Sequence, residues 1–337
     1  MEFKGINAQW LRWVGAAVGA SIVALAGCGG GDPVEAFRPT RIVAFGDEAS
    51  VIAPSASASA VDARKYSVNA FALNASGVAL STYDCRSNAL WIQSVASAFG
   101  LRFKACPNGD ADTSATGLIY AAPKAKVADV KTQIDNFIAA EQPFSNSDIV
   151  TVMAGTYDVL EQYALHPATP ETTLTEVVKQ RGKDLAMQVN RVAVTGAPVI
   201  VVRMPSVGLT PYGVSQSDGG AMLNRLSAAF NNELQLNLIN DGHLIGLVYG
   251  DSDIQFAVTN AAALGLTNAK EPSCLAARSA TDKLDPSVLL GCTTETLVTE
   301  ASKSATAYLW AGNVQLGPYG QSRLGSLAAS RAINNPF

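Results

Sequence analysis

Histidine is scarce in this chain and charge is sparse. Only His166 and His243 occur among 337 residues, and 15% of the residues are charged. Neither histidine stands at a spacing from the cysteines that fits a common zinc site, so we expect no metal and no cofactor. The 24 basic residues form no cluster and are outnumbered by 28 acidic ones, which gives a net charge of −4. We therefore expect no nucleic-acid partner.

An apolar run long enough to cross a bilayer is also missing from the N-terminus. Trp13–Ala26 is apolar but about fourteen residues long, shorter than the roughly 20 residues that a spanning helix needs. Together with the preceding Lys4 and Arg12, this run is typical of a signal peptide. It ends in Leu-Ala-Gly-Cys28, which resembles a bacterial lipobox, where cleavage precedes the cysteine and lipid is attached to it. An ordinary secretory signal with an incidental cysteine is the alternative.

The lipobox interpretation divides the chain into three parts. We expect residues 1–27 to be a lipoprotein signal peptide, residues 28–38 a flexible tether, and residues 39–337 a single domain, long enough for a substantial core. Gly29, rather than an aspartate, follows Cys28 and favours the outer membrane over the inner one. The mature protein would then be held by its acyl chains in the bacterial cell envelope, facing the periplasm or the exterior.

Apart from Cys28, the chain has four cysteines. They allow three connectivities, and we expect the two pairs that are local in sequence. An exported protein meets an oxidising compartment, which favours disulfide formation. The predicted pairs are Cys85–Cys106 and Cys274–Cys292.

Short apolar runs alternate with longer segments of helical periodicity. This pattern predicts a parallel sheet covered by helices on both faces, with functional groups at the carboxyl ends of the strands. In one of the predicted helices, Val130, Ile134 and Ile138 share a face. An edge hairpin is expected around Asn74–Gly77, and a cysteine-bracketed loop over residues 268–292. The predicted strands are Arg41–Phe45, Asp148–Met153, Pro198–Arg203 and Leu244–Tyr249, and the predicted helices are Asn88–Phe99, Val127–Glu141, Thr172–Thr195, Met222–Ile239 and Ser322–Ala332.

Four segments resemble, in order and spacing, the chemistry-bearing blocks of the SGNH/GDSL ester hydrolases. They are residues 41–50, 113–117, 150–158 and 309–321. Two of them are apolar strands that run into glycine turns, as in that family. The resemblance implies a flavodoxin-like three-layer α/β/α sandwich with a mainly parallel central sheet.

The chemistry itself departs from the family at four positions. Glu48 stands where the family has its nucleophilic serine, and Tyr157 where it has asparagine. Gly312 and Gln315 replace the aspartate and histidine of the last block. Gly117 matches the glycine whose backbone N–H helps to form the oxyanion hole.

These departures remove what ester hydrolysis needs. The reaction requires an oxygen nucleophile, a base and donors for the developing oxyanion. The carboxylate of Glu48 would repel that oxyanion, and Gln315 cannot act as a base near neutral pH. We therefore expect a catalytically inactive SGNH/GDSL-like envelope lipoprotein. Its role would be to bind a small-molecule, glycan or acyl ligand or to serve as a scaffold.

The alternative is an active ester hydrolase, of the lipase, esterase or glycan deacetylase type, that uses a non-standard site. Ser50 could be its nucleophile, or Glu48 could pair with Asp47 or Asp158 for acid–base work on glycans. In the simpler interpretation, Ser50 begins a helix and Asp47 and Asp158 brace backbone turns. We expect all three residues to line the cleft. A third class is a purely interacting lipoprotein. A preformed pocket at Glu48, Tyr157 and Gln315 would favour binding, whereas a filled cleft would favour this third class.

Overall fold

The computed structural model describes residues 37–54, 59–109, 111–141, 143–301 and 304–334. The predicted signal peptide, Cys28 and nearly all of the predicted tether lie outside the described residues. Within the described part of the chain, no helix is both long enough and apolar enough to cross a bilayer.

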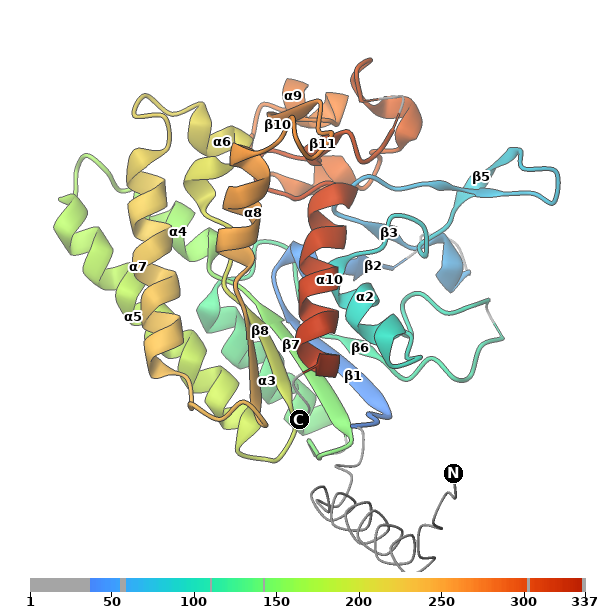
Figure 1. Cartoon of the computed structure of the whole chain (residues 1–337), viewed down its shortest axis with the longest axis horizontal. Coiled ribbons are helices and arrows are strands. Elements are labelled where there is room, and N and C mark those ends of the chain that lie inside the picture. Colours follow the sequence, from blue (N-terminus) through green and yellow to red (C-terminus); the bar gives the residue numbers. More distant parts are fainter. Residues whose placement is uncertain (1–36, 55–58, 110, 142, 302–303, 335–337) are drawn as a thin grey trace, which may run out of the picture. The chain divides into compact units, whose positions relative to one another are not determined.

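A five-stranded parallel sheet forms the centre of the domain (Figure 1). Its spatial order is β6-β1-β7-β8-β9, which in order along the chain is 2-1-3-4-5. That order is the flavodoxin-like arrangement, so the predicted fold class is confirmed. The strands are β1 (Arg41–Gly46), β6 (Leu118–Ile119), β7 (Asp148–Met153), β8 (Val199–Val202) and β9 (Ile245–Val248).

Helices cover both faces of this sheet. Val43 and Val150 face one helix layer, formed by α3, α5 and α7. Ile42 and Ile149, next to them in the same strands, face the other layer, formed by α2, α8 and α10. Side chains alternate between the two faces of a strand, and both layers exclude water, so the strands are mainly apolar. The α-helices are α2 (Trp91–Ala98), α3 (Val127–Ala140), α4 (Thr156–Tyr163), α5 (Glu171–Ala193), α6 (Pro211–Val214), α7 (Ala221–Asn237), α8 (Gly250–Thr259), α9 (Leu275–Ser279) and α10 (Pro318–Asn334).

The face predicted for α3 is partly wrong. Val130 and Ile134 are fully buried, but Ile138 is 46% exposed and Phe137 is buried in its place. With 3.6 residues per turn, Phe137 lies closer than Ile138 to the line through Val130 and Ile134. Its ring also stacks on Phe144 at a centroid distance of 4.2 Å.

The predicted loop over residues 268–292 contains regular structure. β10 (Asn268–Pro272) pairs in parallel with β11 (Tyr308–Trp310) in a separate two-stranded sheet, and α9 follows β10. The last motif block therefore begins on this small sheet and not on the central one. Apolar side chains, including Val68 and Leu289, pack with the Cys274–Cys292 disulfide in a core of their own, which a search for long periodic segments does not find.

The predicted hairpin is present and projects from the body of the domain (Figure 1). β4 (Phe71–Leu73) and β5 (Ala79–Tyr83) pair around the Asn74–Gly77 turn. They form a two-stranded sheet of their own and not an edge of the central sheet. The remaining short elements are β2 (Ile52–Ala53), β3 (Arg64–Lys65) and the 3₁₀ turns η1 (Glu48–Ser50), η2 (Ala60–Asp62), η3 (Val207–Leu209), η4 (Pro286–Leu289) and η5 (Thr294–Thr296).

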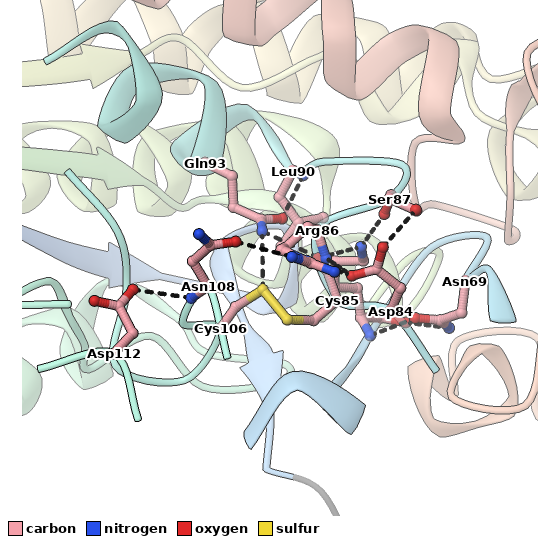
Figure 2. The surroundings of a disulfide bond; sticks show 11 residues. Asn69, Asp84, Cys85, Arg86, Ser87, Leu90, Gln93, Cys106, Asn108 and Asp112 are labelled. Carbon is pink, nitrogen blue, oxygen red and sulfur yellow. Dashed lines mark hydrogen bonds and ion pairs between the residues drawn. A yellow bond between two sulfur atoms is a disulfide. The ribbon is translucent and has the colours of Figure 1, made fainter. Parts of the chain in front are cut away.

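Both predicted disulfides are present. Cys85–Cys106 and Cys274–Cys292 have Cα–Cα distances of 5.8 and 5.9 Å. Around the first, the Gln93 side chain donates hydrogen bonds to the carbonyl of Cys85 and, at 3.6 Å, to the sulfur of Cys106 (Figure 2). The disulfide and the Gln93 amide together hold the segment between α2 and β6 against α2.

Candidate functional site

Two glycine turns bring the motif blocks to one edge of the sheet. Gly46 ends β1, and Gly155 lies two residues after β7 and directly before α4. Their φ angles are 131° and 121°, which a side chain would strain. A Cβ atom at Gly46 would lie 1.9 Å from the carbonyl oxygen of Met153, its register partner in β7. The side chain of Gln133 bonds both the N–H and the carbonyl of Gly46, at 2.8 and 3.0 Å. The residues after each turn therefore meet at the carboxyl rim.

At this rim the carboxylate of Glu48 accepts hydrogen bonds from three sides. Its Oε1 accepts from the hydroxyl of Tyr157 and, at 2.8 Å, from Nε2 of Gln315. Its Oε2 accepts from the backbone N–H of Lys124 at 3.0 Å. The Gln315 amide also lies 3.3 Å from the Tyr157 oxygen. We call these four residues the Glu48 cluster, and the side chains of Glu48, Tyr157 and Gln315 are all buried.

Gly312 belongs to the same arrangement. A Cβ atom there would lie 2.3 Å from Oε1 of Gln315 and 2.9 Å from a methyl group of Leu289. The glycine therefore leaves the space that the Gln315 amide occupies. The four positions that depart from the family pattern, Glu48, Tyr157, Gly312 and Gln315, all meet in one place.

The sheet order is flavodoxin-like, and the four positions meet at one rim, as the SGNH/GDSL resemblance implies. No family model and no curated protein matches the chain. Among solved structures it is similar to an acetyl xylan esterase from Geobacillus stearothermophilus, with 13% identity over 89% of this chain and 97% of that one and a TM-score of 0.42. It is also similar to a phospholipase A1 from Streptomyces albidoflavus, with 15% identity over 66% of this chain and 82% of that one and a TM-score of 0.34.

Gly117, which the resemblance matches to an oxyanion-hole glycine, takes no part in the Glu48 cluster. That residue precedes β6, whose Leu118 pairs with Val43, so it lies well before the carboxyl rim. Its N–H donates to the carbonyl of Arg102 at 2.8 Å and is already used. The backbone N–H that reaches the rim after β6 is that of Lys124, which has a left-handed φ of 59°.

Sequence reasoning missed Lys124 because β6 is only two residues long and no glycine marks the turn that follows it. The signal that could have found it is the short apolar run Leu118–Tyr120 followed by Pro123. Such a run reads as a strand ended by a proline-containing turn.

The other predicted site residues have structural partners. Asp47 caps η1 by accepting from the N–H of Ala49 at 3.1 Å. Asp158 accepts from the N–H of Val127 at 3.0 Å, at the start of α3. Both positions match the turn-bracing interpretation.

Ser50 is neither an exposed nucleophile nor a helix-start residue. It is fully buried, it is the last residue of η1, and Asp47 provides the cap. The indole N–H of Trp91 donates to its hydroxyl at 3.2 Å. Ser50 does not line the rim cavity, contrary to the expectation from sequence.

Burial governs the ionisation of this site. The pKa of Asp47 lies well above its ordinary range because burial and the neighbouring charge of Glu48 both oppose its ionisation. Burial, and then Glu48, raise the pKa of Tyr157, so its hydroxyl stays a neutral donor. Burial also raises the pKa of Asp158 to about 6, although the N–H of Val127 opposes this shift.

Little space remains at the rim. The cavity beside the cluster has a volume of about 30 Å³, room for about two water molecules. Asp47, Glu48 and Gln315 line it, but neither Asp158 nor Ser50 does. His166 and His243 are exposed and are not among its lining residues. Throughout the described ranges, no group of three His, Cys, Asp or Glu side chains is placed to hold a metal ion.

Proposed function

We propose that this protein is a non-hydrolytic SGNH/GDSL-like lipoprotein of the bacterial cell envelope. The observation that carries the proposal is the position of the Glu48 carboxylate. The N–H of Lys124 and the hydroxyl of Tyr157 come from the turns after β6 and β7, where an SGNH hydrolase keeps donors for the oxyanion. Both donate to Glu48. The protein's own carboxylate thus occupies the place of the reaction's developing charge.

The same arrangement removes the other parts of the reaction. Glu48 stands in place of the serine. Gln315 stands in place of the histidine, and its Nε2 donates to the carboxylate instead of acting as a base. In an analogous triad, loss of the serine or the histidine lowers the rate about 10⁶-fold. Loss of one oxyanion donor lowers it about 10²- to 10³-fold. These losses are not additive, yet any one of them makes the reaction slow.

The volume of the rim cavity supports one of the two non-catalytic roles, that of a scaffold, over the binding of a ligand at the rim. Sites for small molecules usually enclose about 300–1,000 Å³, and the cavity at the cluster encloses about 30 Å³. A filled cleft favours a protein that acts through its outer surface over one that binds a ligand in the old active site.

The test is hydrolysis of p-nitrophenyl acetate, butyrate and octanoate by the full chain, beside Glu48→Ala and Ser50→Ala variants. We expect all three proteins to release p-nitrophenol no faster than buffer. Turnover by the native chain that disappears in the Glu48 variant would show an unorthodox carboxylate nucleophile or acid–base group. Turnover that disappears only in the Ser50 variant would show a serine enzyme, and either outcome refutes the proposal.

A further inference from the structure

A second, larger cavity lies outside the Glu48 cluster. It has a volume of about 420 Å³ and lies between α6 and residues 270–283, which adjoin near the top of Figure 1. We call it the α6 cavity. It shares no lining residue with the rim cavity. The two cavities flank the same pair of segments, since Thr210 and Val314 line one while Pro211 and Asn313 line the other.

The α6 cavity is cationic in a chain whose net charge is negative. Lys270, Arg278 and Lys283 line it, against a single carboxylate, Glu271. That carboxylate is already bound by Arg278 at 2.9 Å and by the amide of Asn268 at 3.2 Å. Among the described residues, no carboxylate lies within salt-bridge distance of Lys270, and Lys283 donates only to the carbonyl of Arg278, at 2.6 Å. Ammonium donors therefore remain available for an anion.

The opposite segment supplies a flat apolar wall. Pro211, Tyr212 and Val214 of α6 line the cavity, with Pro272 beside the cationic residues. The Tyr212 ring is half-buried. Aromatic and proline rings present flat apolar faces, against which the C–H face of a ring-shaped ligand packs.

Asn313 adds a fixed acceptor. Its side chain is 8% exposed and lines the cavity. Nδ2 donates to the carbonyl of Ala277 at 2.9 Å, which fixes the orientation of the amide. Among the described residues none donates to its Oδ1, so this oxygen remains available to accept from a ligand hydroxyl.

We propose that the α6 cavity binds an anionic sugar, a pyranose ring that carries a carboxylate or a phosphate. Lys270 and Lys283 bind the anion, Tyr212 packs against the ring, and Oδ1 of Asn313 accepts a hydroxyl. The volume suits one such ring, since small-molecule sites begin at about 300 Å³. The proposal does not depend on whether the Glu48 cluster hydrolyses esters.

Isothermal titration of the full chain with glucuronate, glucose 6-phosphate, glucose and orthophosphate tests it. We expect at least one of the two anionic sugars to bind at least 10-fold more tightly than glucose and orthophosphate. Which of them binds more tightly identifies the anion. The double variant Lys270→Gln, Lys283→Gln should weaken that binding at least 10-fold, whereas Lys104→Gln, an exposed lysine outside the cavity, should leave it unchanged.

Tyr212 separates a sugar site from a simple anion site. Tyr212→Phe should keep the affinity for the anionic sugar, and Tyr212→Leu should weaken it several-fold. The proposal is overturned if neither anionic sugar binds, or if orthophosphate or glucose binds as tightly as the tighter of the two anionic sugars. It is equally overturned if the double lysine variant, with an unchanged circular dichroism spectrum, binds as the native chain does.

Discussion

At the scale of single residues, Glu48 behaves as a ligand that the chain supplies to itself. Replacing it by alanine leaves the hydroxyl of Tyr157 and the N–H of Lys124 without their acceptor. The amide of Gln315 loses the shorter of its two hydrogen bonds and keeps the one to the Tyr157 oxygen. A buried donor without a partner costs about 1–3 kcal/mol, and water entering the new space offsets part of that cost. We expect Glu48→Ala to lower the free energy of unfolding by about 2–4 kcal/mol in urea titrations.

The same variant should accept a carboxylate from solution. Acetate fits where the Glu48 side chain was, and it would meet the same three donors. We expect acetate at tens of millimolar, at constant ionic strength and pH, to raise the melting temperature of Glu48→Ala and not that of the native protein. Acetamide, which has the same shape without the charge, is the control. If acetate and acetamide act alike, the three donors do not form an anion site.

Asp158 makes stability depend on pH. Its pKa in the folded protein is about 6, above the ordinary 3.8, because of burial. A carboxyl group with a raised folded pKa contributes stability that is fully present below about pH 4 and is lost as pH rises through 6. A shift of this size corresponds to about 3 kcal/mol between the two ends of that window.

The variant Asp158→Asn isolates this contribution. Its Oδ1 can still accept from the N–H of Val127, so the cap of α3 is preserved. We expect the free energy of unfolding between pH 4 and pH 7.5 to fall less steeply in Asp158→Asn than in the native chain. Asp135→Asn, at an exposed ion pair, should leave the native slope. Parallel profiles for the native chain and Asp158→Asn would contradict the assignment.

At the scale of elements, the turn after β11 is one unit in which Gly312 and Gln315 depend on each other. A methyl group at position 312 would lie 2.3 Å from Oε1 of Gln315, and overpacking of this kind costs about 1–3 kcal/mol. We expect Gly312→Ala to be clearly destabilising in the native chain and much less so in a Gln315→Ala background. A double-mutant cycle measures this coupling. If the two substitutions lower the free energy of unfolding additively, Gly312 and Gln315 do not depend on each other.

Long periodic elements were predictable from sequence, and short ones were not. Four of the five central strands, the helices α2, α3, α5, α7 and α10, and both disulfides follow from apolar runs, helical spacing and cysteine counting. The convergence of Glu48 and Tyr157 also followed, because the carboxyl ends of parallel strands share one edge. Gln315 follows the separate sheet of β10 and β11, and only the family resemblance predicted that it would join them. Lys124 did not, because a two-residue strand carries no periodicity and a left-handed lysine has no sequence signature. The buried Ser50 depends on how Trp91 packs, which local sequence does not specify.

At the scale of the whole molecule, the proposed envelope location rests on Cys28. We expect the chain, produced in a Gram-negative host, to fractionate with the outer membrane and to carry acyl chains on Cys28 by mass spectrometry. Cys28→Ala should lose the acyl chains and leave the outer-membrane fraction. Gly29→Asp is the matched control, because it should keep the acyl chains but move the protein to the inner membrane. An unmodified Cys28 in the native protein would contradict the lipobox interpretation.

The attachment of the Glu48 carboxylate to the same chain as its donors has a consequence for evolution and for inhibitors. A tethered ligand has an effective concentration far above that of any dissolved one, because its translational freedom is already lost. Dissolved esters, carboxylates or transition-state analogues would have to compete with that local concentration for the donors of Lys124 and Tyr157. The Glu48 carboxylate occupies these donors because it belongs to the same chain and not because it binds tightly. Substitution of residue 48 can therefore free the donors, whereas a higher concentration of a dissolved ligand cannot.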